Sequence, residues 1–305
     1  MSCQFSFACI PQLRFNRQMF VETKSALDLT AVTIKVWLFI VVTAMLHLFI
    51  GYEIAGRLGL FIGFLMAVAL NILVFFFGQT QLIGKMQARR LEGQDGWGLN
   101  ELISSYANRA GVPTPAVYLM EHETPSAFAI GHTWRKSAVC ISTGLLQKFT
   151  PEEVEAVVAH QVCHIRRLDT FAFGVSSTIA NSFTGLAQTL DLLWPVNWFR
   201  KTHKQRPFMT LLSPLAWMVI RLSVSDKNYY QNDDLAASLL GERSALASAL
   251  WKLESYSQTG PLEIPPCTSH LFVVNPEGLK ETNWFFLTHP KMESRLRRLV
   301  GYYPL

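Results

Sequence analysis

The sequence is poor in charged residues. Only 16% of its 305 residues are Asp, Glu, Lys or Arg, whereas 50% are hydrophobic. This length suits one large domain or two small ones, and the composition is too apolar for an ordinary soluble protein. The formal net charge is only +5, and no run of Lys and Arg is interleaved with aromatic residues. We therefore expect no nucleic-acid partner, and the small basic excess fits a membrane surface better.

Cysteine is also scarce. The five cysteines are an odd number, are scattered, and show no CxxC spacing. A disulfide framework or a cysteine zinc cluster is therefore not expected, and a reducing compartment fits better. The N-terminus lacks an apolar core followed by a small-residue cleavage site, so we expect no cleavable signal. We expect residues 1–30 to form an N-terminal tail.

Two apolar runs occupy residues 31–54 and 58–78. Each reaches the roughly 20 residues that a helix needs to cross a bilayer, and only the short link EIAGR separates them. A transmembrane helical hairpin is predicted, with a pair of buried core helices as the alternative. Basic residues flank the hairpin on both sides: Arg14, Arg17, Lys24, Lys85, Arg89 and Arg90. The positive-inside rule then places both ends in the cytoplasm.

Residues 79–305 are predicted to form the domain that follows the hairpin, and after Gln87 the composition becomes globular. An amphipathic helix with Leu99, Leu102, Ile103 and Tyr106 on one face is expected to end at Gly111. Short strands are predicted at AVYLM, SAFAI and KSAVCIST. The next helix is predicted over residues 151–167, because Thr150 can cap it, a proline follows, and Glu153 can close a capping box.

This last helix carries the pattern His-x-x-x-His. His160 and His164 are four residues apart, which brings both imidazoles to one face, within reach of a single metal ion. The zinc-protease form of the pattern has a Glu after the first His, and this Glu acts as general base. Gln161 stands there instead. The spacing alone is a weak signal for metal binding.

The flanking segments make the signal more specific. The helix VEAVVAHQVCHIRRLD is accompanied, in order, by LEGQDGWGL, PSAFAIG, ISTGLL, HLFVVNP and THPKMESRLRRL. With the apolar hairpin, this set resembles HtpX-type membrane zinc metalloproteases, relatives of the CAAX prenyl endopeptidases, over about residues 30–300. The resemblance implies an α+β, mainly helical fold, in which a transmembrane hairpin precedes a gluzincin-like domain with a small sheet. It also implies a multi-pass protein of a bacterial-type inner membrane, whose protease-like domain faces the cytoplasm.

The resemblance also implies a third zinc ligand, a Glu in a later E-[FY]-x-A-D segment. The matching stretch is YYQND, so Tyr229 stands at the ligand position and Asp233 at the motif's Asp. A shift of register would bring Gln231 nearest, and no Glu lies between Glu155 and Glu242. A phenol is a poor ligand, because it must first lose a proton whose pKa is near 10. Zinc is therefore expected to be weakly held or absent.

Other residues near the motif have alternative roles. Asp226 and Asp233 lie one turn before and after Tyr229, so either could replace the missing ligand. Asp233 is interpreted instead as a partner that orients an active-site histidine. Cys163 could ligate zinc or simply pack, and Asp169 is expected to stabilise the helix end or an arginine.

The sequence also suggests where a peptide would bind. The resemblance implies that an extended peptide adds to an exposed sheet edge beside the zinc helix. The predicted edge strand contains Ala138, Val139, Cys140 and Ile141, with an interior strand as the alternative. The apolar segments 171–194 and 208–222 are interpreted either as further membrane helices or as core or re-entrant helices, and the linker 200–206 between them is basic. Near the C-terminus, Thr288 is a predicted helix cap, and Glu293 and Arg297 have the spacing of a helical ion pair.

Two functions therefore compete. The first is a catalytically impaired, HtpX-like homologue that binds peptides or a membrane-protein partner. The second is an active zinc endopeptidase in membrane protein quality control. Both share the fold and the bilayer as a partner, so only the state of the site distinguishes them.

Overall fold

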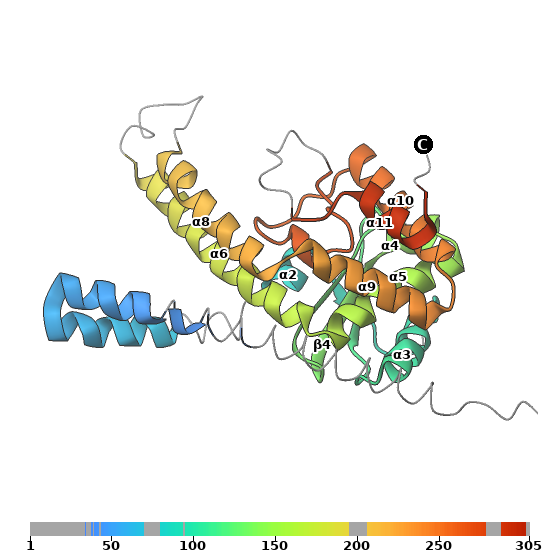
Figure 1. The fold of residues 1–305 in the computed structure, drawn as a ribbon, viewed down its shortest axis with the longest axis horizontal. Helices are drawn as coiled ribbons and strands as arrows, with labels where there is room; N and C mark the ends of the chain where they lie inside the picture. The colour runs from blue at the N-terminus through green and yellow to red at the C-terminus, as the bar shows by residue number, and fades with distance from the viewer. Residues whose placement is uncertain are drawn as a thin grey trace, which may run out of the picture.

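The computed structural model describes residues 34, 38, 40–42, 44–69, 80–93, 95–194, 206–278 and 288–302 (Figure 1). The tail expected over residues 1–30 and linker residues 200–205 lie outside the described residues. The described part is mainly helical and contains one small sheet, so the α+β prediction is confirmed.

A helical hairpin occupies residues 40–69. Its turn is at Gly56, where φ is 58°, a backbone conformation that glycine adopts without a Cβ clash. The two limbs approach closely, because a Cβ added to Gly51 would collide with the carbonyl oxygen of Gly59. Small residues permit this kind of close packing between membrane helices.

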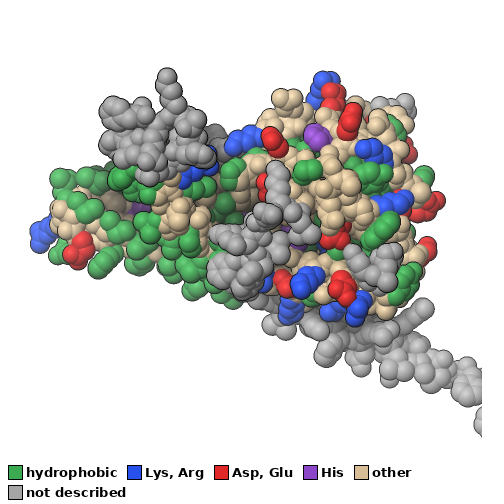
Figure 2. Space-filling model, turned by 90° about the horizontal axis from the view of Figure 1, so that it is seen from above, with side chains coloured by type: hydrophobic (Ala, Val, Ile, Leu, Met, Phe, Trp, Pro, Cys, Tyr) green, Lys and Arg blue, Asp and Glu red, His purple; other side chains and the backbone are tan. Residues whose placement is uncertain are grey.

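Within the described residues, two helical stretches, 40–69 and 207–240, are long and apolar enough to cross a membrane by length and composition. The first is the hairpin, whose apolar side chains are mostly exposed (Figure 2). The second stretch consists of two helices, α8 (Pro207–Ser223) and α9 (Asp226–Leu240), with a break after Ser223. The predicted spans 31–54 and 58–78 lie only partly within the described residues.

Four strands form one mixed sheet in the order β1-β2-β4-β3. They are β1 (Arg89–Arg90), β2 (Ala116–Met120), β3 (Ala127–Thr133) and β4 (Lys136–Ser142). β2 and β4 run parallel, whereas β1 pairs antiparallel with β2, and β3 pairs antiparallel with β4. The three longer strands coincide with the apolar runs that predicted them. After Lys136, every residue of β4 is buried, so both faces of this strand are covered.

Helix α5 (Pro151–Arg166) lies at the centre of the globular part and follows α4 (Thr143–Lys148). It begins with the predicted capping box, in which Glu153 N–H donates to the Thr150 hydroxyl and Thr150 N–H donates to the Glu153 carboxylate. The helices that pack on it are α3 (Leu99–Ala110), α9 and α10 (Ser244–Thr259). The predicted apolar face of α3 is buried against this core. Residues 156–165 of α5 are all buried, so its histidines lie inside the protein.

A long pair of helices, α6 (Asp169–Leu193) and α8, extends from the globular part (Figure 1). The Asp191 carboxylate accepts the backbone N–H groups of Phe208 and Met209 at 2.9 and 3.0 Å, and so caps the start of α8. Several leucines on the outer faces are exposed: Leu186, Leu192, Leu193, Leu211, Leu215 and Leu222. The pair therefore presents an apolar surface to its surroundings.

Three short elements complete the described fold: α2 (Thr80–Lys85), η1 (Ser269–Leu271) and α11 (Met292–Val300). The prediction that Thr288 caps the last helix is wrong, because α11 begins at Met292 and Lys291 occupies its cap position. The Thr288 hydroxyl lies 3.3 Å from that of Ser269 instead. The predicted pair of Glu293 and Arg297 is confirmed, with its charged atoms 2.7 Å apart.

Candidate metal centre

His160 and His164 lie on successive turns of α5 and face the same side. Their ring centroids are 4.8 Å apart, and the rings are nearly perpendicular. Both side chains are buried, with relative exposures of 0% and 4%. The helix thus brings the two expected ligands together in the interior.

The nearest partner of His160 is Asp233 on α9. The Nε2 atom of His160 lies 3.0 Å from Oδ1 of Asp233. A carboxylate can only accept a hydrogen bond, so Nε2 carries the proton and the lone pair is on Nδ1. Nδ1 is buried and has no hydrogen-bond partner within the described part of the chain. Burial lowers the pKa of His160 to about 4, although Asp233 opposes the shift, so the ring is neutral at physiological pH.

Arg295 on α11 is buried against the same aspartate. Its Nε and Nη2 atoms donate to the two Asp233 oxygens at 2.8 and 2.7 Å, and its Nη1 donates to the Val273 carbonyl at 2.8 Å. Nη2 also lies 3.3 Å from Nε2 of His160. Burial alone would raise the pKa of Asp233, but the guanidinium holds it well below its usual range. A permanent positive charge therefore lies beside His160.

His164 contacts Asn232 on α9. The Asn232 Nδ2 atom lies 2.6 Å from Nδ1 of His164 and donates to Oδ2 of Asp169 at 2.7 Å. The same nitrogen lies 3.4 Å from Nε2 of His164, and Nδ1 lies 3.4 Å from Oδ2 of Asp169, so both ring nitrogens face polar neighbours. Arg167 Nε also donates to Asp169, at 3.2 Å, in keeping with the arginine pairing expected for this carboxylate. Asn232 thus contacts both nitrogens through which His164 could bind a metal.

Gln161 joins α5 to the sheet. Its side chain is fully buried, and its Nε2 atom donates to the Ala127 carbonyl of β3 at 3.3 Å. Its Oε1 atom has no partner among the described residues. Unlike the carboxylate of a glutamate, this amide cannot accept a proton from water.

Tyr229 packs beside His164, and its hydroxyl is hydrogen-bonded to a backbone carbonyl. The O–H group donates to the His270 carbonyl at 3.1 Å, and the ring packs edge-on against His164, with centroids 6.2 Å apart. Burial raises the pKa of the phenol above its ordinary value of 10. Tyr229 is therefore a neutral packing residue in this arrangement.

The other proposed ligands are also engaged elsewhere. Asp226 pairs with Arg221 at 3.3 Å, where both are partly exposed. The Gln231 side-chain oxygen accepts a hydrogen bond from Arg167 at 2.6 Å. Cys163 is fully buried, and burial raises the pKa of its thiol, which disfavours the thiolate that zinc would need. None of the three replaces the missing glutamate.

Known proteins are similar in sequence to this chain over most of its length. The profile of peptidase family M48 matches residues 94–302. The chain belongs to this family. A "Protease HtpX homolog" of Sulfurovum sp. is 32% identical over 264 residues, which cover 84% of this chain and 94% of that protein. Another of the same name, from Thermodesulfovibrio yellowstonii, is 30% identical over 276 residues and covers 88% and 97%. These matches make the chain an HtpX-type member of M48.

A solved structure also aligns with the chain. The crystal structure of S. mikatae Ste24p is 17% identical, with a TM-score of 0.46, over 91% of this chain and 67% of that one.

The residues of this M48 member do not fit the zinc ion that the resemblance implies. A zinc ligand must offer an unprotonated donor atom with an accessible lone pair. Nδ1 of His160 does so, whereas Asn232 contacts both ring nitrogens of His164, and the Tyr229 phenol keeps the proton that it donates to the His270 carbonyl. Among the described residues, no three or more His, Cys, Asp or Glu are grouped to hold a metal. The Arg295 guanidinium beside His160 would also repel a dication.

The sheet order corrects the predicted substrate strand. Ala138, Val139, Cys140 and Ile141 lie in β4, which is hydrogen-bonded to β2 on one side and to β3 on the other. β4 is therefore an interior strand, and the edge prediction was wrong. Its continuous apolar run agrees with this place, because a strand buried on both faces does not alternate with polar residues.

The edge beside α5 is β3, and another part of the chain covers it. Val273 N–H donates to the Ala127 carbonyl at 3.2 Å, and Phe128 forms an antiparallel bridge with Phe272. The Phe128 and Phe272 rings also pack, with centroids 4.9 Å apart. At this point, residues 272–273 fill the position that an added peptide strand would take.

Sequence reasoning missed two residues of the centre. Arg295 shares a helical face with the buried Met292 and Leu299. The sequence pattern alone therefore places an arginine on the apolar face of α11, which is unusual enough to indicate a buried partner. Asn232 stands where the E-[FY]-x-A-D pattern has its alanine, and this departure was also readable. Its contact with His164 and Asp169 follows only from the packing of α9 on α5.

Proposed function

We propose that this chain is a membrane-anchored M48 member with impaired peptidase chemistry, which binds polypeptide segments or a membrane-protein partner. One observation carries the proposal. Every expected zinc ligand except His160 has its donor atom engaged or protonated, and the Arg295 guanidinium lies beside His160.

A second defect supports the proposal independently. A zinc peptidase needs a carboxylate that accepts the proton of the attacking water, and loss of such a base costs about 10²–10⁴-fold in rate. Gln161 has no such capacity, and its amide is directed to the β3 backbone. Restoring metal binding alone would therefore leave the chemistry incomplete.

Partner binding is proposed for the surfaces that remain free. The β3 edge is covered at Phe128, so strand addition beside the histidines is disfavoured in this state. The exposed leucines of the α6–α8 pair form an apolar face, and a membrane-protein helix is the partner that would match it. A role in membrane protein quality control fits such a surface.

The alternative is an active zinc endopeptidase. The M48 profile covers residues 94–302, which include both histidines of α5, and this favours it. It requires zinc binding to displace Asn232 from His164 and to bring in a third ligand. Chelator-sensitive cleavage by the unmodified chain would distinguish it from the impaired homologue.

The proposed topology has both ends of the hairpin in the cytoplasm. Its support is the basic residues on either side of residues 31–78, against only Arg57 in the turn. A reporter fused after Gln87 is expected to be active in the cytoplasm of a bacterial host. Activity in the periplasm would overturn the topology.

Proteolysis tests the proposed function. We expect no casein cleavage from wild type, Gln161→Glu or Tyr229→Glu, and measurable cleavage only when both changes are combined with Asn232→Ala. Base and metal act on the same water, so their effects should be strongly non-additive. His160→Ala in the combined variant is the matched control and should abolish cleavage. Robust, chelator-sensitive cleavage by wild type would contradict the proposal.

A further inference from the structure

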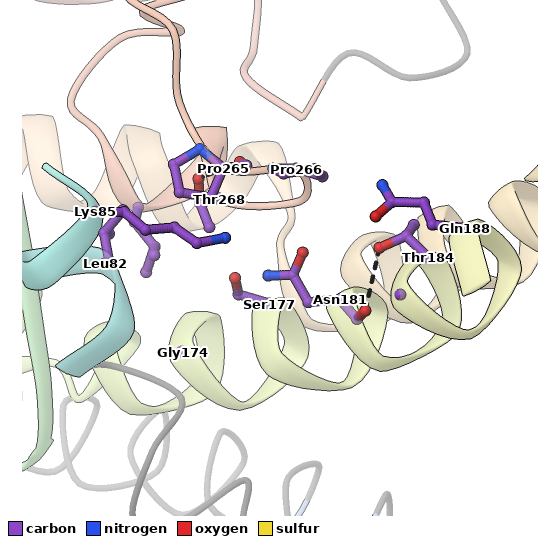
Figure 3. A pocket seen from close by; sticks show the side chains of 12 residues that line it. Leu82, Lys85, Gly174, Ser177, Asn181, Thr184, Gln188, Pro265, Pro266 and Thr268 are labelled. Atoms are coloured by element: carbon purple, nitrogen blue, oxygen red, sulfur yellow. Dashed lines mark hydrogen bonds between the residues drawn. The ribbon is translucent and has the colours of Figure 1, made fainter. Parts of the chain in front are cut away.

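A cavity of about 190 Å³ lies between α2, α6 and residues 265–271 (Figure 3). None of the residues of the histidine centre lines it. Leu82 and Leu271 give it apolar walls, and Pro265 and Pro266 border it on the side opposite α6. The cavity is thus separate from the site described above.

One face of α6 turns a stripe of polar side chains toward this cavity. Ser177, Asn181, Thr184 and Gln188 follow one another at intervals of three or four residues, the spacing of a single helix face. The Thr184 hydroxyl bonds to the Asn181 carbonyl at 3.2 Å. Among the described residues, the hydroxyl of Ser177 and the amides of Asn181 and Gln188 have no hydrogen-bond partner, although α6 is otherwise largely apolar. These groups are available to a ligand.

Among the described residues that line the cavity, Lys85 alone is charged. It is the last residue of α2, and Figure 3 shows its ammonium group extending over the α6 stripe. No described acidic residue pairs with it or borders the cavity. The lining therefore combines one uncompensated positive charge with several N–H and O–H donors.

We propose that this cavity binds a phosphate group, supplied by the headgroup of a membrane lipid. A phosphate offers a negative charge and several acceptor oxygens, which match one ammonium and a row of neutral donors. The volume is below the roughly 300–1,000 Å³ of pockets for drug-sized ligands, and corresponds to about six water molecules. A headgroup fits this space, whereas the acyl chains would have to lie outside it.

The position of the cavity favours a lipid over free phosphate. Lys85 follows Gly78, the last residue of the second apolar run, by seven residues in the sequence, so the proposed membrane placement puts it near the headgroup layer. On the other side, α6 continues to the exposed Leu186, Leu192 and Leu193. In Figure 2, hydrophobic side chains cover most of the extended left end of the molecule, while most charged side chains lie on the globular part at the right. The inference rests on the membrane placement proposed above, and not on the state of the histidine centre.

Native mass spectrometry of the full chain in nanodiscs tests the inference. The probes are phosphatidylglycerol, diacylglycerol as the same lipid without phosphate, and inorganic phosphate as competitor. Wild type should retain one phosphatidylglycerol and no diacylglycerol. Lys85→Gln and Asn181→Leu should each weaken retention about tenfold, the effect of one lost charge-assisted hydrogen bond. Lys227→Gln, an exposed lysine on α9, is the matched control and should change nothing.

Each other outcome has a definite meaning. Displacement of the lipid by millimolar inorganic phosphate, with the same dependence on Lys85, would support the phosphate site and assign it a soluble ligand as well. Equal retention of diacylglycerol, or equal losses for Lys85→Gln and Lys227→Gln, would overturn the inference. Flotation of the full chain with lipid vesicles separates the remaining two outcomes. If the chain floats with the vesicles but lipid retention does not depend on Lys85, the phosphate site is refuted and the membrane placement is kept. If the chain does not float, the membrane placement is refuted, and with it the lipid as the source of the phosphate.

Discussion

Arg295→Met is the perturbation that probes the buried centre most sharply. The substitution keeps much of the side-chain volume but removes two hydrogen bonds to Asp233 and one to the Val273 carbonyl. Asp233 is 1% exposed, so its carboxylate would remain charged and buried without a cation. Removing one partner of a buried ion pair costs about 3–5 kcal/mol, more than the pair itself contributes relative to apolar residues.

At about 2.1 cal/mol/K of unfolding entropy per residue, that loss in a 305-residue chain corresponds to a fall in Tm of about 5–8 °C. Thermal unfolding of the detergent-solubilised chain, followed by tryptophan fluorescence at one fixed scan rate, would measure it. Arg297→Met on the same helix is the matched control, because Arg297 is exposed and its pair with Glu293 is worth at most about 1 kcal/mol. Replacing both Arg295 and Asp233 with apolar residues should recover much of the loss. Equal, small effects of Arg295→Met and Arg297→Met would refute the reasoning.

Three further predictions concern single contacts. Tyr229→Phe removes only the hydrogen bond to His270 and should lower the free energy of unfolding by about 0.5–1.5 kcal/mol without changing zinc content, as denaturant titration and metal analysis would reveal. Asn232→Ala should free Nδ1 of His164 and raise zinc uptake modestly in equilibrium dialysis; unchanged uptake would contradict the lone-pair argument. Gly59→Val should separate the hairpin limbs and reduce the yield of membrane-extracted protein, whereas Gly84→Ala, which meets no neighbour, should not.

Local features of the sequence predicted local structure well. Thr150, Pro151 and Glu153 specify the start of α5 by capping alone, and the structure contains that box. The spacing of His160 and His164 required only a helix to bring the two rings together. Short apolar runs likewise predicted three strands, because each bounded run can be recognised without its neighbours.

The errors concern features that depend on distant partners. The order β2-β4-β3 is set by pairing between separate segments, so the run at Val139 could not by itself distinguish an edge from an interior strand. The contacts of Asn232 and Arg295 arise where α9 and α11 pack together near α5. Thr288 was a reasonable cap by composition, but α11 begins farther along the chain. Nothing local in the sequence encodes these juxtapositions.

Zinc stoichiometry tests the central claim most directly. The full chain, purified from zinc-supplemented cells and dialysed against a mild chelator, would be analysed for metal by mass spectrometry. The variant Tyr229→Glu with Asn232→Ala would be treated identically, because it restores an anionic ligand and the lone pair of His164. We predict substoichiometric zinc in wild type and a clear rise toward one ion per chain in the variant. One tightly held zinc in the wild-type chain, lost on His160→Ala, would contradict the account.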